Sequence, residues 1–185
     1  MQTSSLPQGW AIADIVLKAI TALGTLFVVA LSLVLTARSK RADMFVDCRR
    51  RFEEINSSKK QLRLADPKPL KHEVLEWYST FWGHQQDQFN FWQKGYIDDA
   101  TFHYWCGNRD AERTKNETLS WRDGANVGTT SYREGWDYIK SDKQVFDPRF
   151  IEFVNDLWSL PLKGAIAKRE PKEWGARAMR FLGGD

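Results

Sequence analysis

The order of hydrophobic and polar positions divides the chain into one long apolar block and a longer, mixed remainder. Residues 19–37 contain nineteen consecutive positions without a formal charge. On a helix with a rise of 1.5 Å per residue this block covers roughly 28 Å, close to the ~30 Å hydrocarbon thickness of a bilayer. The pattern predicts a transmembrane helix over residues 10–37, preceded by a short N-terminus of residues 1–9.

A cleaved signal peptide is the alternative interpretation of the same block. Signal peptides have an apolar core of about 7–15 residues that follows a basic start. Here the block is longer, and Lys18 is the only basic residue before it. We therefore expect a membrane anchor that stays on the protein.

Six polar side chains lie in or just before the apolar block, and they share one side of the predicted helix. At 100° per residue they fall within a band of about 60°. From position 14 to position 32 the spacing alternates between fours and threes if the apolar position 28 is counted, as in the seam of a left-handed helix pair. We call this set the polar stripe: Asp14, Lys18, Thr21, Thr25, Ser32 and Thr36.

The stripe allows several interpretations. Its hydroxyls can bond back to the carbonyl four residues earlier, and Asp14 and Lys18 are one turn apart and can pair. Small polar side chains also permit close packing against a neighbouring helix, of a second copy or of another membrane protein. In a ring of copies the stripe would instead line a narrow aqueous path. A monomer is the remaining possibility.

Basic residues gather directly after the span: Arg38, Lys40, Arg41, Arg49, Arg50 and Arg51. Because basic residues stay on the cytoplasmic side, this bias predicts an outside N-terminus and a cytosolic C-terminal domain. Anionic lipid head groups attract such residues by about 1 kcal/mol each, so lipid contact explains them and no nucleic acid is expected. In a reducing cytosol Cys48 and Cys106 are expected to be free thiols.

Beyond the membrane the apolar spacing predicts an all-α cytosolic domain over residues 38–160. The first helix is expected to continue to about residue 64, where "DPKP" stops it. Further helices are predicted at residues 70–94, 98–113, 132–141 and 147–158, with a loop at 114–131. Asp147 is expected to cap the last of them, with Pro148 in its first turn. Residues 161–185 are basic and are predicted to form a flexible tail.

The composition is rich in aromatic residues, with nine tryptophans and eleven phenylalanines. Such side chains bury 150–250 Å² each, so about 120 residues can still form a core. Most of these aromatic residues are therefore expected to pack inside a small helical bundle.

A resemblance follows from the order of these segments. A span with basic flanks, then "FWQKGYIDDATFHYW", then "YREGWDYI" and "DPRFIEFVNDLW" resembles small bacterial inner-membrane proteins with one span and a helical cytosolic domain of unknown function. The resemblance covers about residues 10–160. It implies a bacterial inner membrane and supplies no activity, cofactor or site residue.

Residue types that carry chemistry are sparse. His103 and Cys106 lie one turn apart on the predicted third helix, and Asp99 lies one turn before His103. A structural zinc site needs four ligands, however, and no second CxxC or HxxxH pair exists. Phosphate-binding, nucleophile-elbow and kinase motifs are missing. The sequence thus predicts no enzyme, metal or cofactor. It favours a membrane interaction or scaffold subunit that self-associates or joins a complex, with a possible cytosolic protein partner. The alternative is an oligomeric pore-forming effector or channel subunit.

Overall fold

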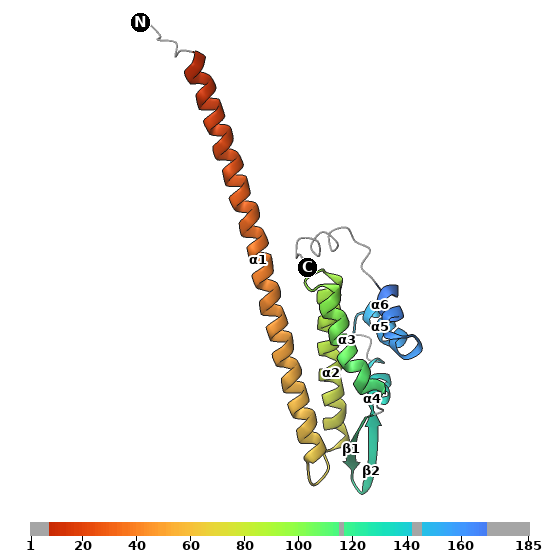
Figure 1. Cartoon of the computed structure of the whole chain (residues 1–185). Helices are drawn as coiled ribbons and strands as arrows, with labels where there is room; N and C mark the ends of the chain where they lie inside the picture. Colours follow the sequence, from red (N-terminus) through yellow and green to blue (C-terminus); the bar gives the residue numbers. More distant parts are fainter. Residues whose placement is uncertain (1–7, 115–116, 142–145, 170–185) are drawn as a thin grey trace. The chain divides into compact units, whose positions relative to one another are not determined.

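The computed structural model describes residues 8–114, 117–141 and 146–169, with side chains described for 12–107, 117–141 and 146–169. The chain forms two compact units, which we call the N-terminal unit (Met1–Lys40) and the folded unit (Arg41–Asp185). The elements, shown in Figure 1, are α1 (Gln8–Leu64), α2 (Lys71–Gln93), α3 (Asp99–Thr114), β1 (Thr118–Asp123), β2 (Asn126–Ser131), α4 (Tyr132–Ile139), α5 (Pro148–Ser159) and α6 (Leu162–Lys168).

Helix α1 begins at Gln8 and ends at Leu64, so the predicted end of the first helix is confirmed. Two prolines, Pro67 and Pro69, follow within five residues; proline lacks the N–H that a helix needs and restricts the residue before it. The peptide bond between Asp66 and Pro67 is cis.

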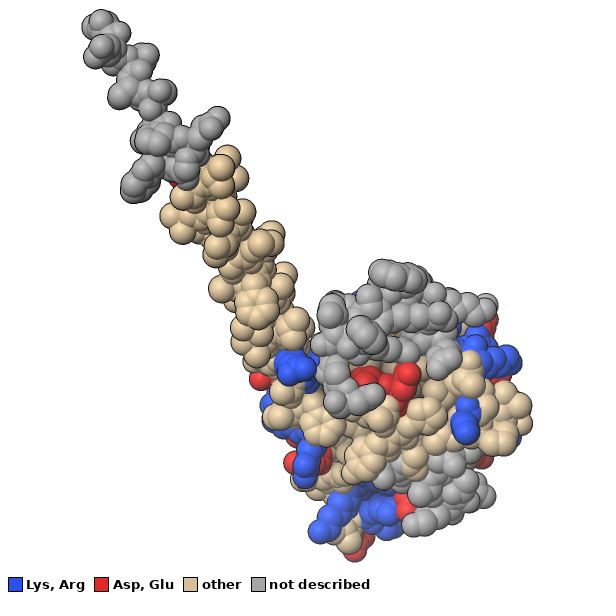
Figure 2. All heavy atoms as spheres, turned by 45° about the horizontal axis from the view of Figure 1, so that its top comes forward, with Lys and Arg blue, Asp and Glu red and all other residues tan. Residues whose placement is uncertain are grey.

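The part of α1 in the N-terminal unit has no covering layer of protein among the described residues. Apart from the partly buried Val34, its described large apolar side chains are exposed, from 47% for Leu31 to 69% for Phe27. This helix is long and apolar enough to cross a membrane by length and composition, and none of its most apolar stretch is buried. Figure 2 shows the stretch as largely uncharged surface.

Helix α2 is the central element of the folded unit and packs against α3, α4 and β1, while α6 packs against α3 and α5. Aromatic rings fill the space between these helices. Trp92, Phe102 and Phe150 are at most 2% exposed, and the rings of Trp92 and Phe102 stack with centroids 4.3 Å apart. The predicted aromatic core is confirmed.

The C-terminal part of α1, within the folded unit, buries one face. Cys48 and Ile55 are 2% and 6% exposed, and Phe52 packs partly buried against the core. Trp77 on α2 donates its indole N–H to the carbonyl oxygen of Ile55 over 3.0 Å. The apolar spacing of this segment in the sequence therefore does mark the face that packs.

The all-α prediction is only roughly correct, because part of the expected loop at 114–131 forms an antiparallel hairpin of β1 and β2. Leu119 on β1 is buried at 2% exposure, and Thr130 on β2 at 7%. Only one face is buried, and the short strands carry Ser, Thr and Gly, so the alternation of apolar and polar residues is weak. The turn signal was nevertheless present: Gly124 is the first of the two turn residues between Asp123 and Asn126, and its φ of 58° is one that glycine adopts readily.

The helix starts of the C-terminal half follow from local capping. Ser131 and Glu134 form a reciprocal capping box at the start of α4. The predicted cap of α5 is confirmed: the Asp147 carboxylate accepts from the N–H of Arg149 over 2.8 Å, and Pro148 is the first helical residue.

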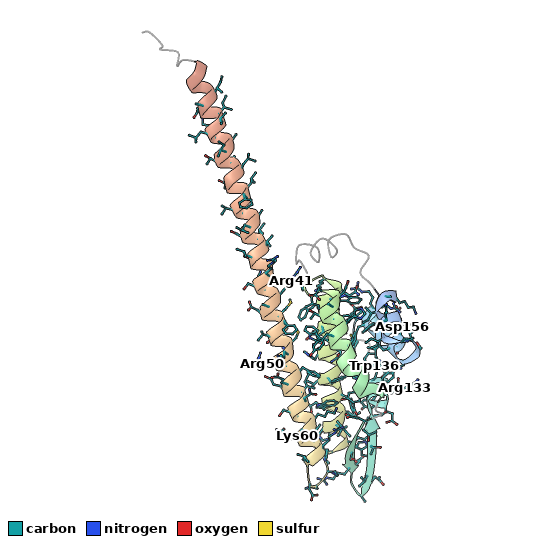
Figure 3. The ribbon with its side chains drawn as sticks, viewed as in Figure 1. Arg41, Arg50, Lys60, Arg133, Trp136 and Asp156 are labelled. Carbon is teal, nitrogen blue, oxygen red and sulfur yellow. The ribbon has the colours of Figure 1, made fainter. Side chains whose placement is uncertain are left out.

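The packed chain extends past residue 160, where the sequence predicts the tail to start. Helix α6 follows, with Ala165 at 0% and Ile166 at 2% exposure. The carboxylate of Asp156 on α5, labelled in Figure 3, lies 2.7 Å from both the Lys168 ammonium and a guanidinium nitrogen of Arg169. Two of the basic residues on which the predicted tail rests, Lys168 and Arg169, thus form ion pairs with α5. Residues 170–185 lie outside the described residues.

Candidate functional site

All six residues of the polar stripe lie on the single helix α1, and all six are exposed. Because they share one uninterrupted helix, the angular band of about 60° follows directly from the helical repeat. The stripe therefore exists as one continuous surface of the N-terminal unit.

The polar groups at the N-terminal end of the stripe are satisfied within the helix itself. The Lys18 ammonium lies 2.7 Å from the Asp14 carboxylate. Thr21 donates its hydroxyl to the carbonyl oxygen of Leu17, and Thr25 donates to that of Thr21, each over 2.9 Å. A hydroxyl has one hydrogen to donate, so these two threonines offer a neighbouring helix acceptor lone pairs and a small, close-packing side chain.

The six basic residues after the span divide into two kinds. Arg49 pairs with Glu53 at 3.0 Å, Arg50 with Asp47 at 2.6 Å, and Arg51 with Asp47 at 3.0 Å. These charges are matched by carboxylates of their own helix and, for Arg51, also by Asp87 of α2 at 3.4 Å. The hydrogen bond from Arg50 lowers the pKa of the Asp47 carboxyl.

Arg38 and Lys40 are exposed, while Arg41 is partly buried (Arg41 and Arg50 are labelled in Figure 3). Arg49 lies eight residues beyond Arg41, which is about 12 Å along a helix. Arg38 and Lys40 are therefore better suited than Arg49, Arg50 and Arg51 to meet an anionic surface.

A buried polar cluster in the folded unit was not predicted from the sequence. We call it the Lys59 cluster: Lys59 and Arg63 of α1, Glu117 just before β1, and Tyr132 of α4. The Lys59 side chain is 9% exposed, and its ammonium donates to the Glu117 carboxylate over 2.7 Å and to the Tyr132 hydroxyl over 2.6 Å. Arg63 pairs with the same carboxylate at 2.9 Å.

The hydrogen bond from Lys59 is the largest influence on Glu117 and lowers the pKa of its carboxyl, although partial burial acts in the opposite direction. The Lys59 ammonium also lies 5.0 Å from the centroid of the Tyr132 ring, a cation–π distance. Every strong group of the cluster has a partner within the protein, so the arrangement ties α1 to the hairpin and α4. One signal was available in the sequence: Lys59 continues the apolar spacing of Cys48, Phe52 and Ile55.

The residues considered for metal chemistry take other roles. The Asp99 carboxylate accepts from the indole N–H of Trp92 over 2.7 Å, and Cys106 is buried at 8% exposure. Among the side chains of residues 12–107, 117–141 and 146–169, no group of three His, Cys, Asp or Glu is placed to hold a metal ion.

Comparison with known proteins gives no relative: no family model matches the chain, and neither a curated protein nor a solved structure is similar to it. The resemblance to small bacterial inner-membrane proteins therefore stays a prediction.

Proposed function

We propose that this chain is a single-pass membrane protein that acts as an interaction or scaffold subunit, associating through the polar stripe of α1. The observation that carries the proposal is the exposure of the apolar stretch of α1, none of which is buried. Exposed apolar patches beyond a few hundred Å² are rare on soluble monomers. A bilayer provides the covering that the described protein does not.

The local hydrogen bonds of the stripe support this assignment. A polar side chain in hydrocarbon is costly unless it is satisfied, and the donors of Thr21 and Thr25 already bond to their own backbone. The helix can thus enter lipid before it meets a partner. Association would then come mainly from close packing of small side chains, with cross-helix hydrogen bonds averaging ~0.6 kcal/mol.

The proposed orientation places the N-terminus outside and the folded unit in the cytosol of a bacterium. Lys18 is already paired with Asp14, whereas Arg38 and Lys40 follow the span and are exposed. Since basic residues beside a span favour the cytoplasmic side, the basic flank favours an inner-membrane protein with its C-terminal domain inside. A cytosolic protein partner for the folded unit belongs to the same proposal.

The mass of the full-length protein in native-lipid nanodiscs tests the proposed association. The double variant Thr25→Leu, Ser32→Leu replaces two small side chains of the stripe with bulky ones. The control variant Ala19→Leu, Ala30→Leu introduces two leucines on the opposite side of the helix. We expect the stripe variant to lower the oligomeric fraction about tenfold, equivalent to about 1.4 kcal/mol, and the control variant to behave as wild type. A monomeric wild type, or equal effects of both variants, would contradict the proposal.

The same variants separate a scaffold from a pore. If the stripe lines an aqueous path, wild-type protein in liposomes should release trapped ions and the Thr25→Leu, Ser32→Leu variant should not. A scaffold leaves the liposomes sealed in both forms.

A further inference from the structure

The turn between α2 and α3 lies at the end of the folded unit where α1 enters it. Phe45 on α1 stacks with Trp105 on α3, with ring centroids 5.7 Å apart, and Figure 1 shows α3 running in the same direction as this part of α1. Asp99, the first residue of α3, precedes Trp105 by six residues, about 9 Å along a helix. The start of α3 is therefore at the same end of the folded unit as Arg41, which Figure 3 labels.

The backbone of this turn, residues 94–98, has a fixed conformation. Gly95 has a φ of 72°, the left-handed conformation in which glycine commonly ends a helix. The N–H of Gly95 donates to the carbonyl oxygen of Trp92 over 3.0 Å, and the N–H of Tyr96 donates to that of Phe91 over 2.8 Å. These are the two hydrogen bonds of a Schellman motif. The motif holds the Tyr96 ring beside the Phe91 ring, with centroids 6.4 Å apart.

The turn presents an aromatic ring and a cation at the protein surface. Tyr96 is 39% exposed in spite of its contact with Phe91, and Lys94 is exposed and forms no ion pair with another described residue. The neighbouring carboxylates have partners within the protein: Asp98 accepts from a backbone N–H of α3 over 2.6 Å, and Asp99 accepts from an indole N–H over 2.7 Å. Tyrosine is enriched at the membrane–water interface, and anionic head groups attract lysine.

The proposed span brings a lipid surface to this end of the folded unit. The span ends at residue 37, and Arg41 follows it by four residues of the same helix, about 6 Å. We propose that the turn 94–98 docks on the head-group layer of the membrane that α1 crosses, with the Tyr96 ring among the head groups and the Lys94 ammonium beside anionic phosphate. This inference rests on the proposed function and adds a second membrane contact, which holds the folded unit against the bilayer.

Quenching of a fluorescent label by lipid tests the docking. Ala100, just after the turn, and Ala125, in the hairpin turn, are both exposed. Full-length Ala100→Cys and Ala125→Cys proteins are labelled with a small fluorophore; the native Cys48 and Cys106 are 2% and 8% exposed, and labelled wild type gives the background. The vesicles contain phosphatidylcholine, phosphatidylglycerol and lipids with a head-group nitroxide in both leaflets. We expect quenching of the label at position 100 and none at position 125.

Paired variants test the two side chains of the turn. In the Ala100→Cys protein, Lys94→Glu with Tyr96→Ser should lower the ratio of docked to undocked protein about fivefold, with a corresponding loss of quenching. The conservative variant Lys94→Arg, Tyr96→Trp should keep the quenching. The matched control Lys60→Glu, Tyr138→Ser makes the same replacements at exposed positions of α1 and α4 and should behave as wild type.

The outcomes separate this inference from the proposed function. Equal quenching at positions 100 and 125, or full quenching in the Lys94→Glu, Tyr96→Ser variant, would overturn the docking. Protein that resists alkaline extraction while the label at position 100 stays unquenched keeps the proposed span and loses the docking, whereas protein that is extracted loses both. Thr25→Leu with Ser32→Leu should leave the quenching unchanged; loss of quenching there would assign the turn to a contact with a second copy and overturn the lipid contact.

Discussion

The polar stripe of the N-terminal unit and the Lys59 cluster of the folded unit satisfy their polar groups over different distances along the chain. In the polar stripe the hydrogen bonds of Thr21 and Thr25 and the ion pair of Lys18 reach only four residues back. In the Lys59 cluster the partners of Lys59 are 58 and 73 residues away. A helix whose polar side chains bond to groups of the same helix needs no other partner for them in a nonpolar solvent. The folded unit, in contrast, needs its tertiary structure to bring partners to a buried charge.

The largest expected effect is removal of the buried cation. Lys59→Ala leaves Glu117 half-compensated by Arg63 and opens a space beside Tyr132, so we expect a loss of about 3 kcal/mol in the free energy of unfolding. Denaturant unfolding followed by tryptophan fluorescence measures it. The control is Lys60→Ala: this neighbouring lysine is exposed, and its removal should change the free energy by less than about 0.5 kcal/mol. Similar losses of unfolding free energy in both variants would show that Lys59 stabilises the fold no more than an exposed lysine does.

An intermediate effect is expected from acid. The pKa of Glu117 is lowered in the fold from its ordinary value of 4.5, so its ionised form stabilises the folded state at higher pH. That contribution is complete well above pH 4.5 and is lost as the pH falls through the lowered pKa. Wild type should therefore lose more stability than Glu117→Gln as the pH falls from about 6 to about 3. The two unfolding profiles should run closer together at the acid end; a constant separation would contradict the assignment.

The smallest effect is expected in the stripe. Thr25→Val removes the hydroxyl but keeps the shape, and the carbonyl of Thr21 stays bonded within the helix. We expect the helix content and membrane insertion to stay as in wild type, with changes of a few tenths of a kcal/mol. Circular dichroism in liposomes and an alkaline extraction assay provide the measurements. A large loss of insertion would mean that the hydroxyls have partners beyond their own helix.

Local and distant contacts also explain what could be predicted from the sequence. The end of α1 before Pro67 and the cap of α5 at Asp147 depend on neighbours in the chain, and both were predicted. The positions on the stripe follow from one helical repeat. In each of these features the interacting residues are only a few positions apart in the sequence.

The features that sequence reasoning missed depend on distant partners. Lys59 is buried because Glu117 and Tyr132 meet it, and nothing near Lys59 in the sequence indicates either residue. The sequence predicts a loop where the hairpin forms. The buried residues of the hairpin are Leu119 and Thr130, and only Leu119 is apolar, so the strand pattern is weak. The sequence predicts a flexible tail where α6 forms, because nothing near Lys168 and Arg169 in the sequence shows that Asp156 of α5 pairs with both.

The ion pairs of Asp156 set a boundary for work with shortened forms of the protein. A stop codon after Leu160 would remove Lys168 and Arg169, leaving an 8% exposed aspartate without either counter-ion. It would also uncover the core surface against which Ala165 and Ile166 pack. An expressed domain should therefore include residue 169. A shorter form that ends before residue 169 would have a damaged core, so its behaviour could not be assigned to the removed segment alone.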